Sequence, residues 1–521
     1  MAQQKSEDRI GPEGGVTPAE PAGSSTGGQG KAIPVEEVAS QLELPVATAE
    51  NPRGATRAAA PDRSGAGHAG APEATVNAEE GTPATMEEVA RRLTSALRNV
   101  AQNKGAPGPD GQTIEELRER WPVVRPKLEA DLIAGTYRPG EIRRAEIPKV
   151  GGGQRDLGIP NVVDRVVQEA VRQVLEPRFE PSFHPSSHGF RPGRSCHTAV
   201  AEAKAHLEDG HEWAVDLDLE KFFDRVCHQR LMARLAERVS DRRLLVAIGR
   251  MLKAKVLLPD GVVIASEEGV PQGSPLSPLL SNVVLDELDR ELARRGHRFV
   301  RYADDANVYV RSERAGLRVM ASLTDFIERR LRLKVNRSKS AVARPEERHF
   351  LGFCLRRCPE TGTVEVLLSE RTKRDAMERI RKLTPRTWGG SLASCIARIN
   401  VWLVGWHGFF GIAPASEEFT LRALDAHIRR RLRAIVLSHW KRRRTIARNL
   451  EALGVARHTA WRRVYAGRKS RWALSHDPAV DRGLRNAYFA ERGLVFLVDL
   501  HRRRHEGIAA PAQPQLALEW G

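Results

Sequence analysis

The chain is poor in cysteine and has no long apolar run. Its cysteines are few, odd in number and scattered through 521 residues, a pattern typical of reduced thiols rather than of a disulfide scaffold. Cys354 and Cys358 lie close together, but no second cysteine pair or close histidine pair completes a tetrahedral zinc site. No run of about 18 or more apolar residues predicts a transmembrane helix, and the N-terminus lacks the apolar segment of a secretory signal. We therefore expect a cytoplasmic protein without a membrane partner.

Negative charge and aromatic side chains are also scarce. The chain has 66 acidic against 83 basic residues, a formal net charge of +17, which favours a polyanionic partner because neutralising phosphates releases counterions. Residues 1–84 have almost no aromatic residues and are rich in glycine, alanine, proline, serine and glutamate, so we expect a disordered extension. Thr85 and Glu88 then form a capping signal, which predicts that the folded part begins with a helix.

Two acidic segments stand out against this basic background. Residues 301–305 (RYADD) lie between short apolar runs, which predicts a β-hairpin with Asp304 and Asp305 at its tip. Residues 213–219 (WAVDLDL) read as a strand whose alternation places Asp216 and Asp218 on one face. Such carboxylates are costly to bury without a cation, and hard carboxylate oxygens suit Mg²⁺. We expect the two segments to share a sheet and a two-metal site, although the strand alone does not choose between Asp216 and Asp218.

Several ordered motifs resemble those of bacterial group II intron reverse transcriptases and maturases. The first and second catalytic motifs of that family resemble residues 218–224 (DLEKFFD) and 302–305 (YADD), and the loop between them resembles 269–278 (GVPQGSPLSP). The fingers motif resembles 147–160 (IPKVGGGQRDLGIP). Further blocks match 103–111 (NKGAPGPDG), 187–194 (SHGFRPGR), 351–353 (LGF) and 405–406 (GW). The resemblance runs from about residue 86 to the C-terminus, and this order is far more specific than any single motif.

The resemblance implies an α+β, right-hand polymerase fold with fingers, palm and a helical thumb, preceded by the disordered N-terminal extension. The expected parts are the extension at 1–84, reverse transcriptase fingers and palm at 85–365, a helical thumb or maturase (X) domain at 366–455, and a basic DNA- or RNA-binding segment at 456–521. Many family members carry a C-terminal His-Asn-His endonuclease with paired cysteines. The last segment has no such cysteine pairs, so we expect no endonuclease there.

The implied function is that of an RNA-directed DNA polymerase encoded by a group II intron. Such an enzyme acts in intron splicing and mobility, copying RNA into DNA with two Mg²⁺ ions. The implied partners are intron RNA, an RNA template, a DNA target or primer, and dNTPs. Two alternatives stay open: a non-intron reverse transcriptase in defence or repair, and an RNA-binding splicing cofactor without polymerase activity.

The resemblance also assigns roles to single residues. The implied catalytic carboxylates and metal ligands are Asp218, Asp304 and Asp305, and the main-chain oxygen of Leu219 is a further candidate ligand because hard cations also use carbonyls. Phe223 resembles the steric gate that excludes a 2′-hydroxyl, and Gln272 the residue that supports the incoming nucleotide. Lys149 and Arg155 resemble triphosphate contacts, and Lys339 a lysine near the departing pyrophosphate.

The pattern becomes helical and very basic after Phe350. Apolar residues recur at helical spacing between positions 421 and 435, which predicts an amphipathic helix. Two dense basic blocks lie beside and after this stripe, and we expect them to contact RNA phosphates, with a solvated helix face as the alternative. The expected RNA-binding residues are Arg429, Arg430, Arg431, Arg433, Lys441, Arg442, Arg443 and Arg444.

Overall fold

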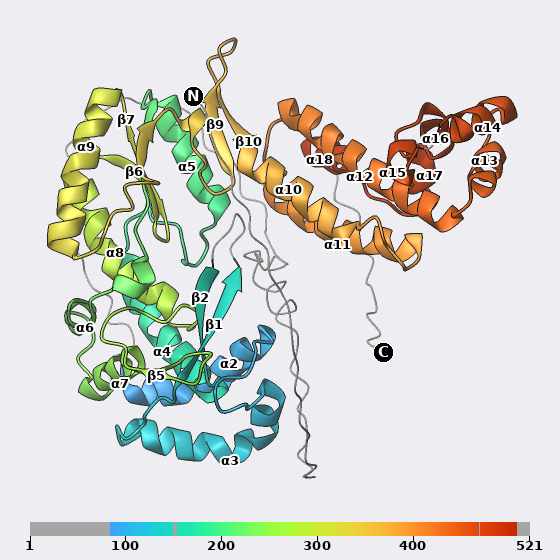
Figure 1. The fold of residues 1–521 in the computed structure, drawn as a ribbon. Helices are drawn as coiled ribbons and strands as arrows, with labels where there is room; N and C mark the ends of the chain where they lie inside the picture. The colour runs from blue at the N-terminus through green and yellow to red at the C-terminus, as the bar shows by residue number, and fades with distance from the viewer. Residues whose placement is uncertain (1–83, 149–153, 468, 508–521) are drawn as a thin grey trace, which may run out of the picture. The chain divides into compact units, whose positions relative to one another are not determined.

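The computed structural model describes residues 84–148, 154–467 and 469–507 (Figure 1). The expected disordered extension, apart from Ala84, and the expected triphosphate contact Lys149 lie outside these described residues. Among the described helices, none combines the length and the apolar character that a bilayer crossing requires.

The first part of the fold combines helices with a small four-stranded sheet. The predicted first helix forms, and the Thr85 side chain caps it by accepting the Glu88 N–H at 3.3 Å. The strand order is β2-β1-β4-β5, with β1 antiparallel to β2 and parallel to β4. The elements are α2 (Met86–Gln102), α3 (Ile114–Ile133), β1 (Ile142–Pro148), β2 (Gln154–Pro160), α4 (Val162–Phe179), β4 (Val256–Leu257) and β5 (Val263–Ile264). Helix α4 packs against α2, and its valine stripe is buried.

A second four-stranded sheet, in the order β6-β7-β3-β8, carries the acidic motifs. Its strands are β3 (Trp213–Leu217), β6 (Arg298–Tyr302), β7 (Asp305–Val310) and β8 (Ala341–Ala343). Side-chain alternation in β3 sends Val215 and Leu217 into the core that α8 (Ser277–Arg294) and α9 (Glu313–Asp325) share. Ala214 faces the opposite core, to which α5 (Cys196–Glu208) contributes. Helices α6 (His228–Ala236) and α7 (Arg242–Leu252) lie between β3 and β4 in the chain. The sheet is therefore the palm expected from the resemblance.

The remaining chain is helical after a hairpin of β9 (Phe353–Arg357) and β10 (Val364–Leu368). The predicted apolar stripe forms the buried face of α12, from Leu421 to Ile435. The helices are α10 (Glu370–Leu383), α11 (Leu392–Phe410), α12 (Glu418–Trp440), α13 (Arg443–Ala452), α14 (Arg457–Tyr465), α15 (Arg471–Leu474), α16 (Pro478–Gly483), α17 (Asn486–Ala490) and α18 (Leu497–His505). Fingers, palm and helical thumb thus follow one another in the expected α+β arrangement.

Candidate active site

Strand register brings the three candidate carboxylates to one end of the palm sheet. Tyr302 pairs with Asp305 across the β6–β7 hairpin, which leaves Ala303 and Asp304 as a two-residue turn. Strand β7 also pairs with β3, and the last printed pair joins Leu217 to Ala306. One register position further, Asp218 lies beside Asp305. The predicted juxtaposition of position 218 with positions 304 and 305 is present, while the catalytic roles of these residues are taken up below as a proposal.

The carboxylates perturb one another's ionisation. The pKa of Asp305 is raised to about 7. The largest cause is desolvation of the carboxyl group, and the charges of Asp304, Asp216 and Asp218 come next. Although Asp305 as a residue is exposed to solvent, its carboxyl group is desolvated, and the like charges add to the rise in its pKa. The charges of Asp304, Asp216 and Asp218 are thus close enough to Asp305 to disfavour its ionised form.

Asp218 is held by the segment that follows α9. Its main-chain N–H donates to the Ser340 hydroxyl at 3.0 Å, and its main-chain oxygen accepts the Asn336 N–H at 2.8 Å. The Lys339 ammonium lies 3.0 Å from the Asp218 carboxylate, and the Lys339 side chain is 69% exposed. Leu219, next in the chain, forms a β-bridge with Val335. The backbone of Asp218 is thus fixed, whereas its cationic partner sits on a mobile, solvated stem.

Asp216, the other acid on this face, has a different partner. Arg348 donates from its Nε to the Asp216 carboxylate at 2.9 Å and also donates to the Lys339 carbonyl at 2.7 Å. Burial raises the pKa of Asp216, and the Arg348 interaction opposes that rise. This guanidinium is tied to two segments, so Asp216 has a structural partner that the sequence could not reveal.

The residues expected to contact the incoming nucleotide come from three segments that pack together. Phe223 is partly buried in a 3₁₀ turn, Phe222–Arg225, and its carbonyl accepts the Val270 N–H at 2.6 Å. The Gln272 carbonyl accepts the Gly158 N–H of β2 at 2.6 Å. Strand β2 also carries Arg155, whose backbone pairs with Ile147 and whose side chain lies outside the described residues. The structure therefore brings the Phe223 turn, the Gln272 loop and the β1–β2 hairpin into contact.

Sequence reasoning missed a buried charged group directly behind the acidic turn. The Arg301 side chain is 0% exposed and pairs with the equally buried Asp289 of α8, with its Nε 2.7 Å from Asp289 Oδ1 and its Nη2 2.6 Å from Oδ2. The available signal was an arginine inside an apolar strand and an aspartate inside the apolar stripe of 285–292. Because a buried charge needs a buried counter-charge, these two residues could have been paired with each other from the sequence.

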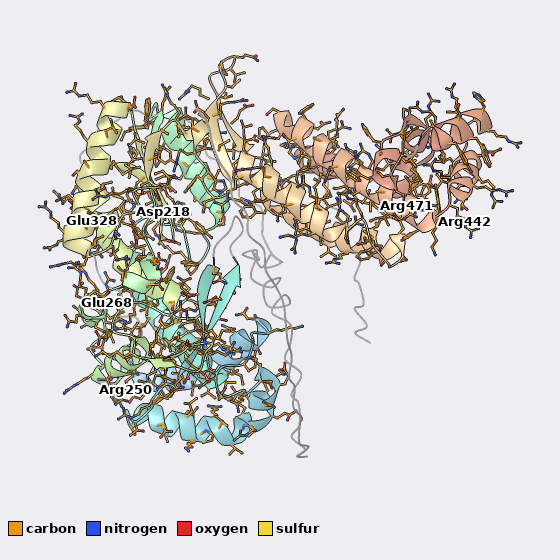
Figure 2. All side chains as sticks on the ribbon, in the orientation of Figure 1. Asp218, Arg250, Glu268, Glu328, Arg442 and Arg471 are labelled. Atoms are coloured by element: carbon orange, nitrogen blue, oxygen red, sulfur yellow. The ribbon has the colours of Figure 1, made fainter. Side chains whose placement is uncertain are left out.

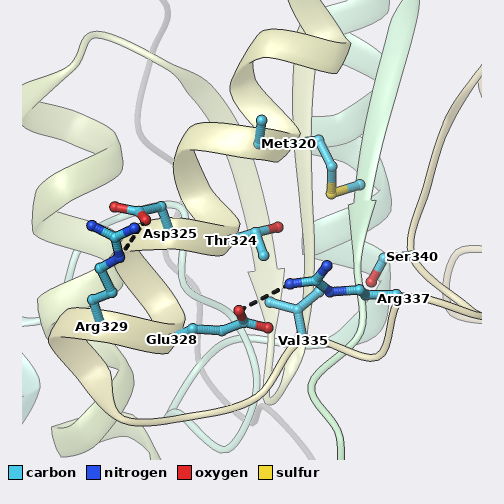
Figure 3. A pocket seen from close by; sticks show the side chains of 9 residues that line it. Met320, Thr324, Asp325, Glu328, Arg329, Val335, Arg337 and Ser340 are labelled. Carbon is cyan, nitrogen blue, oxygen red and sulfur yellow. Dashed lines mark hydrogen bonds and ion pairs between the residues drawn. The ribbon is translucent and has the colours of Figure 1, made fainter.

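A cavity of about 520 Å³ lies next to the segment that fixes Asp218 (Figure 3). Met320 and Thr324 of α9 line one side of it, and Val335, Arg337 and Ser340 line another. Its charged side chains pair among themselves, since Arg337 donates to Glu328 at 3.0 Å and Arg329 lies 2.7 Å from Asp325. We assign no ligand to this cavity.

The expected RNA-binding arginines divide into buried and exposed groups. Arg431 is only 6% exposed, and its Nε donates to the carbonyl and hydroxyl of Thr384 at 2.9 and 2.7 Å. Arg433 is 9% exposed, donates to the Leu484 carbonyl at 2.9 Å and pairs with Asp481. Arg431 bonds within the thumb and Arg433 bonds to the segment after residue 455, so both differ from the expectation. Cations that are desolvated and already paired are not available to phosphates.

The other basic residues of the two blocks keep more solvent contact. Arg430 stacks over Trp472 with its guanidinium carbon 4.1 Å from the ring centroid, and Arg429 lies 5.9 Å from the Phe496 centroid. Arg443 donates to the Gly467 carbonyl at 2.9 Å. The exposed ones are Lys441, Arg442 and Arg444, and Figure 2 labels Arg442 among the side chains of this region.

The described residues contain no preformed metal cage. No group of three or more histidine, cysteine, aspartate or glutamate side chains in that part of the chain is already arranged around a single metal position. All five cysteines are free thiols. The acids at 218, 304 and 305 therefore share a sheet end without a preformed three-ligand cage.

Comparisons with known families agree with this geometry. The family described as reverse transcriptase (RNA-dependent DNA polymerase) matches residues 147–355, which contain the acidic sheet end and the loops packed around it. This part of the chain is a reverse transcriptase domain. The maturase-specific domain of group II introns matches residues 373–453, within the helical thumb. The chain therefore carries a reverse transcriptase domain followed by a group II intron maturase-specific domain, in the order that the motif resemblance implies.

Three curated relatives illustrate the similarity. "Protein YkfC" of Escherichia coli is 37% identical over 209 residues, which cover 39% of this chain and 55% of that protein. "Group II intron-encoded protein LtrA" of Lactococcus lactis is 32% identical over 203 residues, covering 37% and 32%. "Putative COX1/OXI3 intron 2 protein" of Saccharomyces cerevisiae is 26% identical over 381 residues, covering 62% and 44%. The matched regions span about half or less of the length of these relatives.

Proposed function

We propose that this protein is an RNA-directed DNA polymerase of a group II intron that also assists the splicing of its intron RNA. The observation that carries the proposal is the strand register that sets Asp218 beside Asp305 at the turn containing Asp304. In the reaction, a primer 3′-oxygen bonds to the α-phosphorus of a dNTP, the bond to the β-phosphate oxygen breaks, and pyrophosphate leaves with the hydroxyl proton passing to solvent.

The residues at the sheet end fit a Mg²⁺ site by their chemistry. Carboxylate oxygens are hard ligands, and a nearby cation would oppose both the burial and the like charges that raise the pKa of Asp305. Lys339 already places a cationic group on Asp218. Asp218, Asp304, Asp305 and the main-chain oxygen of Leu219 would hold the ions. When bound, two Mg²⁺ ions would stabilise the attacking and departing oxygens of the displacement.

The chain's own residues position the substrates. Phe223 would pack beneath the sugar and exclude a 2′-hydroxyl, and Gln272 would support the incoming nucleotide. Lys149 and Arg155 would contact the triphosphate from the β1–β2 hairpin. Lys339 would release Asp218 and neutralise the departing pyrophosphate, since its exposed stem allows the ammonium to move.

RNA contact would involve the exposed part of the thumb's basic blocks. Lys441, Arg442 and Arg444 keep their charges in solvent, where phosphates can reach them. Arg429, Arg430 and Arg443 are partly covered and would contribute less. The maturase-specific match over this region favours intron RNA over the RNAs of defence or repair systems.

Primer extension on an RNA template tests the proposal. Asp218→Ala should abolish DNA synthesis and leave RNA affinity within about twofold, because the basic surface is untouched. Asp209→Ala, which removes an exposed carboxylate at the end of α5, is the matched control and should keep the wild-type rate. Loss of synthesis and RNA binding to the same extent in Asp218→Ala would contradict the assigned role.

A further inference from the structure

Arg301 lies at the last position but one of β6, directly before the acidic turn. Its buried pair with Asp289 is one part of its bonding. It also donates to the Asn282 side-chain oxygen at 3.0 Å and to the Ser187 hydroxyl at 2.7 Å. Every end of this guanidinium is thus held by an element outside the hairpin, either α8 or the loop at 186–189. A cation so enclosed is fixed in position, because moving it would leave buried charges and polar groups unpaired.

The same side chain reaches forward to the turn. Arg301 Nη1 donates to the carbonyl of Ala303 at 2.8 Å. Ala303 has a φ of 55°, a left-handed conformation that costs free energy for any residue with a Cβ. Such a conformation persists where the surrounding structure imposes it. The bond from Arg301 is a contact that imposes it here.

A second contact meets the turn from the loop at 186–189. A Cβ built on Gly189 would collide with the Ala303 nitrogen, so the two backbones touch. The Gly189 carbonyl accepts the Asn282 side-chain amide at 2.9 Å, and the His188 N–H donates to the Arg301 carbonyl at 2.8 Å. The loop that contacts the turn is therefore hydrogen-bonded to Arg301 and Asn282, the same buried residues that hold the turn.

We propose that Arg301, through Asp289, Asn282 and Ser187, is the positioning residue that fixes the Ala303 turn and thereby keeps Asp304 and Asp305 in reach of Asp218. The inference rests on the proposed polymerase function and deepens it. Arg301 is fully buried, so its side chain is not exposed to a substrate. It acts on the site through the turn, because the hydrogen bonds around Arg301 fix the backbone that carries Asp304 and Asp305.

Two variants separate positioning from mere stability. Arg301→Lys keeps the charge but loses the fork that reaches Asp289 and Ala303 together. Ala303→Gly removes the backbone strain and loosens the turn while all bonds to Arg301 can still form. We expect Arg301→Lys to lower kcat by at least tenfold with the KM for dNTP and the RNA affinity within twofold. Ala303→Gly should raise the melting temperature or leave it unchanged and still lower kcat severalfold.

Arg290→Ala is the matched control. Arg290 pairs with Asp286 at 2.7 Å on the same helix as Asp289, but its side chain is mostly exposed. We expect this variant to keep kcat within twofold. If Arg301→Lys does not fold, Ser187→Ala, which removes one neutral bond to Arg301, replaces it with an expected severalfold loss of kcat.

Mn²⁺ affinity, measured by electron paramagnetic resonance without nucleic acid, separates failure of this inference from failure of the polymerase function. Arg301→Lys, or Ser187→Ala in its place, should weaken Mn²⁺ binding at least fivefold relative to Arg290→Ala, even if the wild-type protein copies no RNA. Wild-type Mn²⁺ affinity and wild-type kcat in the folded Arg301 or Ser187 variant and in Ala303→Gly would overturn the positioning role. A wild-type protein that binds no Mn²⁺ would overturn it as well.

Discussion

The packing of the Gln272 loop against β2 makes Gly273→Ala an informative substitution. Gly273 has a φ of 108°, and a Cβ there would lie 2.5 Å from the Gly158 carbonyl oxygen. The backbone conformation alone costs an alanine about 1–3 kcal/mol. Relieving the clash moves Gly158 and weakens its N–H bond to the Gln272 carbonyl, which adds about 1 kcal/mol. We expect a total loss of about 2–4 kcal/mol in the free energy of unfolding.

Gly261→Ala provides the matched control for the backbone cost. Gly261 has a φ of 86°, and a Cβ there would meet nothing within 4 Å. We expect this variant to lose about 1–3 kcal/mol, from backbone strain alone, and to keep the wild-type KM for dNTP.

Urea unfolding and primer extension measure the two consequences. Because Gly273 follows Gln272, a shift of its backbone would also move Gln272. We therefore expect folded Gly273→Ala to have a several-fold higher KM for dNTP than the wild type. Equal destabilisation by the two variants, or an unchanged KM in folded Gly273→Ala, would refute the close approach of this loop to β2 as a determinant of nucleotide binding.

Three further expectations concern the thumb. Burial raises the pKa of Asp425 to about 6, although its carboxylate accepts hydrogen bonds from the Leu497 and Val498 N–H groups. Its contribution to stability is therefore complete below about pH 4 and is lost as the pH rises through about 6. The wild-type free energy of unfolding should therefore fall by up to about 3 kcal/mol between about pH 4 and about pH 7 relative to Asp425→Asn, measured by urea titration; parallel pH curves would contradict this. Arg433→Ala should destabilise the fold by about 2 kcal/mol, because it breaks buried charge-assisted bonds, and a melting temperature equal to the wild type would contradict its burial. Arg442→Ala should leave stability unchanged and lower the slope of log affinity for RNA against log salt by about 1, and an unaltered slope would remove Arg442 from the RNA interface.

Local patterns in the sequence were sufficient for much of the fold. The acidic hairpin, the alternation of β3 and the buried stripe of α12 follow from periods of two and 3.6 residues, which the backbone imposes on any buried element. The meeting of the β3 acids with the hairpin was expected from their shared need for a cation, because strands so far apart in sequence carry no local signal of pairing. The motif resemblance was needed to favour Asp218 over Asp216. The strand register then placed Asp216 opposite Asn307 and Asp218 beside Asp305, positions that the strand pattern alone left open.

The buried charges could not be predicted from such patterns. Arg431 and Arg433 look like members of a basic surface, but their partners Thr384 and Asp481 lie about fifty residues away along the chain. Arg301 belongs to the motif at the end of β6, whereas its partner Asp289 lies in helix α8. Which cations face solvent depends on tertiary contacts, and these decide between a structural and an RNA-binding role.

The central claim is that Asp218, Asp304 and Asp305 bind divalent ions at one place. Cleavage of the backbone by hydroxyl radicals from bound Fe²⁺ maps that place directly. We expect cuts near residue 218 and near residues 304–305 together, suppressed by Mg²⁺ and lost in Asp304→Asn. Cuts at only one of these segments, or cuts that Mg²⁺ does not suppress, would contradict the claim.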